Sequence, residues 1–402
     1  MLGGKVDVSQ AAEWLPVRTV LLCEPGIETL FALLEIHSAN FLRPFSPARA
    51  RQEHRAFRRA LEAAGARVID LREALAWHAG DDPDALTRLR AWAQESVRYE
   101  FDVAVKGADR DLLRENLRRA IEVFEPATLA DLILLRPRLT IRPNPNVLDP
   151  TSRFLSRFEV LPANNAYYMR DPLITTRLGC VIGRLRLDVR RVENDVAEYA
   201  LRQLGIAPLY RVQAPGFLEG GDFMPAGDFV LQGQGLLSDE DGVGQLLERR
   251  VYGYVEVAVV KDRRSQMDEM HLDTYFSLLG PDLCAVCEDR AGKDQQPEVD
   301  VYRPQGPPDR FVYRKVKTCG FLDYLAGKGL RVLFFSKEEQ ENFAPNGLLT
   351  APYRFIGVRQ AGEAYEGRLQ SQGVQTVFLD FAALTGGYGG PHCSSQVIYR
   401  AV

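Results

Sequence analysis

The chain has little cysteine and no long apolar run. Its 402 residues include six cysteines, too few for the disulfide framework that stabilises small secreted proteins. No stretch approaches the length of a membrane span, and the opening residues 1–5 lead into polar sequence rather than into the apolar segment of a signal peptide. We therefore expect a soluble, cytoplasmic protein.

An excess of either charge is also missing. The formal net charge is −4, and lysines and arginines are scattered among acidic residues, which argues against nucleic acid or a membrane surface as a partner. With 46% hydrophobic and 26% charged residues, the composition is that of a globular protein large enough for one large core or two moderate ones. Whether the chain forms a homo-oligomer stays open.

A zinc-binding pattern is incomplete. Cys284 and Cys287 form a Cys-x-x-Cys, but the chain has neither a second pair at similar spacing nor paired histidines. Their setting, residues 283–287, is apolar and typical of a buried strand. We expect a core position, with a redox or metal role as the alternative.

A unit of strand, turn, strand, amphipathic helix and strand recurs about every fifty residues. Four copies begin with predicted strands near residues 166–169, 221–225, 271–276 and 347–350, and residues 19–71 form a fifth. Each of three polar clusters lies at the first strand of its copy, so packing of the copies in a ring would bring the clusters together. Between residues 72 and 139 the pattern changes to helical runs, which predicts a compact helical insertion that closes at the proline-rich residues 142–146.

A cysteine near the end of the chain is the candidate nucleophile. Cys393 follows a glycine-rich approach over residues 386–391, which permits a tight turn and close approach of a ligand, and we expect its thiol to be accessible. The upstream clusters contribute one histidine and four carboxylates, namely Asp171, Glu219, Asp222, His271 and Asp273. This inventory suits attack on a cationic, nitrogen-rich carbon.

The chemistry of a guanidinium group fits these residue types. A guanidinium is planar, charged and rich in N–H donors, so two carboxylates such as Asp171 and Asp273 can hold it. The thiolate of Cys393 would attack the central carbon, and His271 would protonate the departing nitrogen and later activate water.

In order and approximate spacing, the Arg-Asp-Pro, Glu-Gly-Gly-Asp, His-Leu-Asp-Thr and Gly-Gly-x-x-Cys elements resemble the arginine deiminase family of the guanidino-group-modifying, or pentein, superfamily. The resemblance implies an α/β fold, a five-module ββαβ pentein propeller with a helical-bundle insertion in the first module. Residues 1–71 would be the first module, 72–155 the insertion, and 156–402 the remaining modules, which complete the catalytic domain.

The resemblance also implies residue roles. Cys393 takes the nucleophile position, His271 the general acid and base, and Glu219 and Asp222 the accompanying catalytic carboxylates. Asp171 and Asp273 take the guanidinium-binding positions, and Asn165 and Arg190 those that bind the amino-acid end of arginine. No metal or organic cofactor is implied. The expected activity is hydrolysis of a guanidino compound to ammonia and a ureido product such as citrulline.

Other interpretations stay open on sequence alone. An amidinotransferase would pass the amidino group to an amine, a regulatory pentein would only bind the ligand, and a cysteine protease would not need so many carboxylates. His271 could be a structural histidine or, with Asp273, part of a metal site, and Glu219 with Asp222 could form only a turn. Arg190 could lie on a solvated face. His392 could tune the thiol or shape the loop.

Two departures from the family pattern concern the far end of the substrate. Leu237 and Tyr388 stand where arginine deiminases usually carry arginines, and neither can form a charged fork with a carboxylate. We therefore expect a guanidino compound other than free L-arginine to be the better substrate.

Overall fold

The computed structural model describes residues 6–146 and 152–401, so the opening residues 1–5 and part of the predicted insertion lie outside the described residues. The two ends of the described chain share one sheet. β1 (Val17–Leu22) pairs in parallel with β2 (Arg67–Asp70) and antiparallel with β20 (Gln396–Arg400). Helices α1 (Ile27–Leu34) and α2 (Pro47–Ala63) connect β1 to β2. The strand–helix–strand order was predicted, whereas the pairing with β20 was not.

Four further sheets repeat one pairing pattern, in which the first two strands are antiparallel and the second and third are parallel. Their strands are β6 (Leu173–Thr175), β7 (Cys180–Ile182) and β8 (Tyr210–Arg211); β9 (Phe223–Ala226), β10 (Phe229–Gln234) and β11 (Glu256–Lys261); β12 (Phe276–Leu278), β13 (Leu283–Cys287) and β16 (Arg331–Phe335); and β17 (Leu348–Ala351), β18 (Arg354–Val358) and β19 (Gln375–Leu379). The accompanying helices are α7 (Arg191–Gln203), α8 (Glu240–Arg249), α9 (Phe321–Gly327), α10 (Lys337–Glu341) and α11 (Glu363–Ser371).

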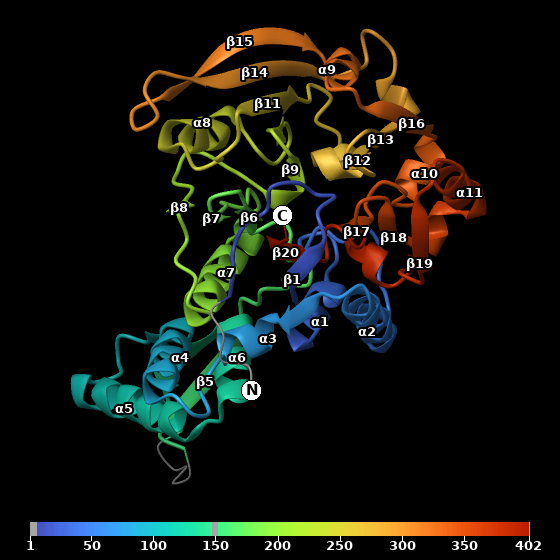
Figure 1. Ribbon diagram of the computed structural model, residues 1–402. Helices are drawn as coiled ribbons and strands as arrows, with labels where there is room; N and C mark the ends of the chain where they lie inside the picture. The colour runs from blue at the N-terminus through green and yellow to red at the C-terminus, as the bar shows by residue number, and fades with distance from the viewer. Residues whose placement is uncertain (1–5, 147–151, 402) are drawn as a thin grey trace.

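One sheet is larger than the repeat predicts. The antiparallel strands β14 (Glu298–Gln305) and β15 (Val312–Gly320) extend the sheet of β9, β10 and β11, and lie along the upper edge of the molecule in Figure 1. The repeat in the sequence does not predict this hairpin. By contrast, β13 is buried throughout, which confirms the core interpretation of Cys284 and Cys287.

The segment after β2 forms a separate lobe at the lower left of Figure 1. Helix α3 (Leu71–Leu75) leads from β2 toward this lobe, which contains α4 (Pro83–Ser96), α5 (Gly107–Val123) and α6 (Pro126–Leu135). The lobe also contains a three-stranded sheet of β3 (Arg98–Phe101), β4 (Pro137–Pro143) and β5 (Phe154–Val160), which the predicted helical insertion did not include. Trp92 of α4 stacks on Tyr199 of α7, with ring centroids 4.6 Å apart, and so packs this lobe against the larger body.

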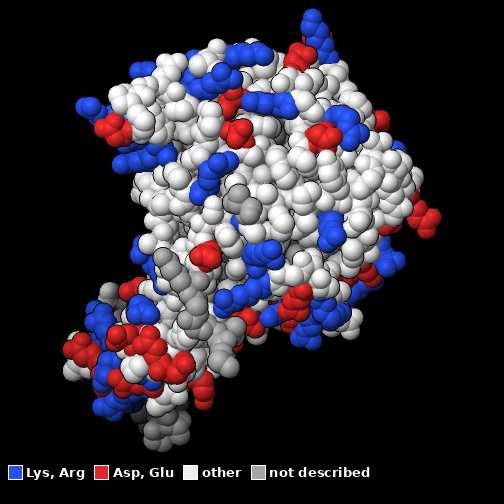
Figure 2. Space-filling view, viewed as in Figure 1, with Lys and Arg blue, Asp and Glu red and all other residues white. Residues whose placement is uncertain are grey.

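The surface differs between the two parts. Acidic and basic side chains crowd together on the lobe in Figure 2, whereas the centre of the same face of the larger body is mostly uncharged. Among the described residues, no helix combines the length and apolar character that crossing a bilayer requires.

The expected first strand at residues 166–169 was also wrong, since these residues form turns and the strand β6 begins at Leu173. The other two polar clusters likewise lie in short helical turns, Gly220–Asp222 and Leu272–Thr274, directly before β9 and β12. A turn releases side chains from the alternation of a strand, so neighbouring polar residues can point to the same place. The clusters are therefore presented by strand entrances rather than by strands.

A buried arginine connects three distant segments. Arg400 of β20 is fully buried, and its Nη2 lies 2.9 Å from the Glu13 Oε2. Its Nη1 donates hydrogen bonds to the carbonyl oxygens of Leu15 and Leu349. Removing one partner of a buried ion pair leaves an uncompensated charge and is strongly destabilising.

We therefore expect Arg400→Met to lower the free energy of unfolding by about 3–5 kcal/mol. Urea denaturation followed by circular dichroism measures this change. Arg18→Met is the matched control, because Arg18 lies on the adjacent strand β1 but is exposed, and its effect should stay within about 0.5 kcal/mol. Equal effects of the two substitutions would contradict the role of Arg400.

Candidate active site

The polar clusters meet at the loop that carries Cys393, and backbone hydrogen bonds fix them there. The Arg170 N–H donates to the Cys393 carbonyl at 3.0 Å, and the Gly220 N–H donates to the Asp171 carbonyl at 3.0 Å. The Leu272 N–H donates to Asp222 Oδ1 at 2.9 Å. Entrances to three different sheets are thereby held together, as the convergence of the repeats predicted.

Cys393 is buried, and the expectation of an accessible thiol was wrong. Only 4% of its surface is exposed. Its Sγ donates to Asp273 Oδ2 at 3.4 Å, and its backbone N–H donates to Asn346 Oδ1 at 3.2 Å. A Cβ added at Gly389 would lie 2.7 Å from the Cys393 Cβ, so glycine allows the loop to fold directly onto the cysteine instead of holding it away from the body.

The electrostatic setting keeps the resting sulfur protonated. Burial, followed by the charges of Asp273 and Asp171, raises the pKa of the Cys393 thiol well above its ordinary value. A cation placed between these carboxylates would reverse the electrostatic contribution and favour the thiolate. The charge state of the sulfur is therefore coupled to the arrival of a positive charge.

His271 and Glu219 form a buried pair, with Nε2 and Oε2 3.1 Å apart. Burial alone would lower the pKa of His271, but the hydrogen bond of Glu219 and the charges of Asp171 and Asp222 raise it to about 10. The pKa of Glu219 is correspondingly lowered, because contact with His271 outweighs burial. A Cβ at Gly221 would lie 2.6 Å from His271 Nδ1, so only glycine lets the ring pack on this backbone. The pair presents an imidazolium that can donate a proton.

Asp171 and Asp273 each have one occupied and one free oxygen. Asp171 Oδ2 contacts Arg190 Nη1 at 2.9 Å, and Asp273 Oδ2 contacts His392 Nδ1 at 2.8 Å. Within the described part of the chain, Asp171 Oδ1 and Asp273 Oδ1 have no hydrogen-bond partner although both carboxylates are buried. Buried acceptors are normally satisfied, so these two oxygens are available to N–H donors of a ligand. Their protein contacts fix the orientation of each carboxylate.

The two carboxylates differ in electrostatics. Burial raises the pKa of Asp171 despite the opposing charges of Arg190 and His271. For Asp273 the opposite holds, because the hydrogen bond and charge of His392, with help from His271, outweigh burial and lower the pKa. Burial also raises the pKa of Asp222 to about 6, against the opposing charge of His271. Asp222 also has a structural role. Its backbone N–H donates to the Glu219 carbonyl within the turn, and its Oδ1 accepts from the Leu272 N–H next to His271.

Asn165 and Arg190 lie beside this cluster but are engaged within the protein. Arg190 is buried rather than on a solvated face, and its Nη2 contacts Glu193 Oε2 at 2.8 Å in addition to the Asp171 contact. Asn165 donates through Nδ2 to the Ala39 carbonyl at 2.9 Å, and its Oδ1 has no partner among the described residues. The guanidinium of Arg190 thus bridges Glu193 and Asp171.

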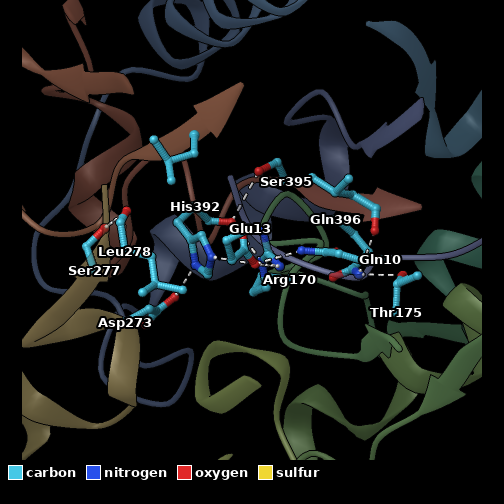
Figure 3. Close-up of polar contacts among 12 residues, drawn as sticks. Gln10, Glu13, Arg170, Thr175, Asp273, Ser277, Leu278, His392, Ser395 and Gln396 are labelled. Carbon is cyan, nitrogen blue, oxygen red and sulfur yellow. Dashed lines mark hydrogen bonds and ion pairs between the residues drawn. The ribbon is translucent and has the colours of Figure 1, made fainter. Parts of the chain in front are cut away.

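Sequence reasoning missed most of the surrounding polar network. Figure 3 shows His392 between Asp273 and Glu13, with Arg170 beyond Glu13. His392 Nε2 lies 3.6 Å from Glu13 Oε1, and Arg170 Nη1 lies 3.5 Å from the same oxygen. His392 was noticed only as a neighbour of Cys393, and no local signal marks Glu13, which lies far away in sequence.

The geometry would allow a metal site, but not at the expected pair of His271 and Asp273. Asp171, Glu219 and His271 each offer a ligand atom, and these atoms lie within 4.8 Å of one another. A histidine must be neutral to bind a metal, however, and the raised pKa of His271 opposes this. The electrostatics favour proton transfer over coordination.

We expect Glu219→Gln to lower the pKa of His271 below its value of about 10, because it removes the hydrogen bond that most raises this pKa, together with the charge of Glu219. Nuclear magnetic resonance titration of the labelled imidazole measures the change. Glu338→Gln is the control, because Glu338 is exposed and outside this cluster. Unchanged titration in Glu219→Gln would contradict the pairing.

The sign of the associated stability effect follows from the raised pKa. The charged His271 stabilises the fold fully below about pH 6.5, and this contribution is lost as the pH rises through about 10. The difference in unfolding free energy between the wild type and Glu219→Gln should therefore shrink toward pH 10.

The arginine deiminase family model matches residues 40–400. The chain is 25% identical to arginine deiminase of Halobacterium salinarum over 81% of this chain and 79% of that protein. It is 26% identical to arginine deiminase of Clostridium perfringens over 96% of both chains.

Solved structures with the same fold include an amidinotransferase of the saxitoxin biosynthetic pathway from Microseira wollei, with a TM-score of 0.56, 15% identity and 98% of both chains covered. DDAH from Pseudomonas aeruginosa complexed with citrulline has a TM-score of 0.53 and 15% identity, with 95% of this chain and 99% of that chain covered. At this identity the structures show the pentein fold alone. On the family match across nearly the whole sequence, the chain belongs to the arginine deiminase family.

Proposed function

We propose that the protein is a cysteine hydrolase that converts a guanidinium compound to ammonia and a ureido product. The observation that carries this proposal is the pair of unpartnered oxygens, Asp171 Oδ1 and Asp273 Oδ1, in the cluster that contains the Cys393 thiol. A guanidinium supplies the N–H donors that both oxygens lack and the charge that the buried carboxylates require.

In the first half of the reaction, the bound cation favours the thiolate, and the thiol proton leaves along the hydrogen bond to Asp273. The Cys393 sulfur forms a bond to the central guanidinium carbon and gives a tetrahedral adduct. The His271 imidazolium donates its proton to one amino nitrogen, the carbon–nitrogen bond breaks, and ammonia departs. An amidino group remains attached to the sulfur.

In the second half, neutral His271 accepts a proton from water while the hydroxide oxygen bonds to the amidino carbon. The carbon–sulfur bond then breaks, which releases the ureido product and restores the thiolate. Ammonia takes the proton that Asp273 received from the thiol and leaves as ammonium. The hydroxyl proton of the product returns to the sulfur and restores the thiol, so one water is consumed for each guanidinium. Glu219 keeps His271 oriented through both steps.

The domain organisation belongs to the same proposal. The five sheets with the repeated pairing pattern support a five-module ββαβ propeller, with strand entrances facing a common centre. In this interpretation residues 1–71 belong to the first module, 72–155 form an insertion with helices and part of a small sheet among its described residues, and 156–402 supply the other modules.

Hydrolysis differs from amidino transfer in the acceptor, which is water in the first reaction and an amine in the second. Assays with and without added amines therefore separate the two.

We expect Cys393→Ala to lower turnover by several orders of magnitude, because it removes the atom that forms the covalent intermediate. Ammonia release measures the loss, and mass spectrometry of rapidly quenched wild type should find an amidino adduct on Cys393. Cys319→Ala is the control, since Cys319 lies on β15 and is unrelated to the site. Substantial turnover by the Cys393→Ala variant would rule out this mechanism.

We expect His392→Leu to move the acid limb of the kcat/KM profile to higher pH. The hydrogen bond from His392 is the main influence that lowers the pKa of Asp273, so its loss raises that pKa and protonates the clamp earlier on acidification. His392→Asn retains a donor and should shift the limb less. Superimposable profiles for wild type and His392→Leu would exclude this role.

A further inference from the structure

A pocket of about 360 Å³ adjoins the buried cluster. We call it the vestibule, and its walls are Leu42, Asp268, Met270, Thr274, Gln340, Glu341, Phe343, Asn346 and Tyr388. Asn346 joins the two spaces, because its Oδ1 accepts from the Cys393 N–H and its Nδ2 donates to the Asp273 carbonyl. The far end of a substrate held at Asp171 and Asp273 would therefore extend into the vestibule.

Hydrogen-bond acceptors dominate the polar part of this wall. Gln340 is only 4% exposed, and its Oε1 has no partner among the described residues. Its Nε2 donates to the Asp268 carbonyl at 2.6 Å, which fixes the amide orientation and leaves Oε1 as the free atom. The Thr274 hydroxyl donates to the His271 carbonyl, and the Asn346 amide is already engaged. A ligand that satisfies Gln340 must bring a donor.

The charged residues of the vestibule also favour a ligand that brings hydrogen-bond donors. The vestibule is lined by two carboxylates and by no lysine or arginine. Asp268 is paired with Lys337 at 2.5 Å, whereas no ion pair within residues 6–146 and 152–401 involves Glu341. Lys337 itself is shared between Asp268 and Glu269, so it offers no free charge to an anion. A carboxylate at the far end of the substrate would meet Glu341 without a compensating cation.

The remaining wall is apolar. Leu42, Met270, Phe343 and Tyr388 supply hydrocarbon and aromatic surface between the buried cluster and the acceptors of α10. Such a surface suits the methylene chain of an alkylguanidine. The face of an aromatic ring also attracts a nearby ammonium.

We propose that the substrate of this site is an alkylguanidine whose far end carries an ammonium group and no carboxylate. Gln340 Oε1 and the Glu341 carboxylate receive the ammonium, and the apolar wall receives the chain. The proposal rests on guanidinium hydrolysis at Cys393 and specifies which guanidinium compound is used.

Three compounds test it: 4-aminobutylguanidine, butylguanidine and L-arginine. They share the guanidinium and differ at the far end, which is respectively an ammonium, uncharged, or an ammonium with a carboxylate. We expect kcat/KM for 4-aminobutylguanidine to exceed that for either other compound by at least about tenfold, because charge-assisted hydrogen bonds are among the stronger ones. A kcat/KM for L-arginine equal to or higher than that for 4-aminobutylguanidine overturns the inference about the far end. The proposal of guanidinium hydrolysis would then still stand.

Variants locate the selectivity. Glu341→Lys should lower kcat/KM for 4-aminobutylguanidine by about tenfold more than it lowers kcat/KM for butylguanidine, which has no ammonium for Glu341 to receive. Glu338→Lys is the matched control, because Glu338 is exposed on the same helix and does not line the vestibule. Equal effects of the two variants overturn the assignment of Glu341. Gln340→Leu should raise KM for the amine more than for butylguanidine, and an equal rise would indicate a structural role only.

The proposed function has its own point of failure. If none of the three compounds releases ammonia, and none binds saturably to Cys393→Ser in calorimetry, both the hydrolase proposal and the substrate class are wrong. Saturable binding of 4-aminobutylguanidine without ammonia release would retain the ligand class and refute hydrolysis.

Discussion

The placement of Asp273 between Cys393 and His392 is the interaction on which the rest of the site depends. One oxygen, Oδ2, receives both the thiol and the imidazole, and Oδ1 is left free. A buried carboxylate with a single fixed contact would be costly and free to rotate. With two contacts on one oxygen, the other oxygen keeps a defined direction toward a ligand.

Holding such a carboxylate requires compensating charge farther out. His392 also contacts Glu13, which in turn contacts Arg170 and Arg400. On the opposite side, Arg190 joins Asp171 to Glu193. Acidic and basic groups therefore alternate away from the thiol, and the innermost carboxylate oxygens, Asp171 Oδ1 and Asp273 Oδ1, have no partner among the described residues. This arrangement explains why residues close to the amino-terminal end of the described chain matter to a cysteine close to its other end.

Local sequence signals were enough to predict the repeated strands and helices, because each unit carries its own apolar periodicity. They were also enough to gather Asp171, Glu219, His271, Asp273 and Cys393, because each belongs to a short motif. They failed where a contact depends on distant segments. Nothing near Glu13 indicates its contacts with His392 and Arg400, and glycines around Cys393 suggested exposure although Gly389 packs on the cysteine itself. The hairpin β14–β15 and the sheet β3–β4–β5 were missed, and the outer strand of each, β15 and β5, is largely exposed and lacks a clear alternation.

The residues around the thiol and those of the vestibule differ in how freely they can be substituted. Around the thiol, a substitution leaves a buried charge without its partner, so the residues proposed to bind the guanidinium are constrained by folding as well as by chemistry. In the vestibule, Leu42 and Glu341 are exposed, and a substitution there disturbs no buried ion pair. Substitutions at such positions can alter which far end of a substrate the vestibule accepts, at little cost in stability. Of the two expected arginine positions, Tyr388 lines the vestibule and fits this division, whereas Leu237 is buried and does not line it.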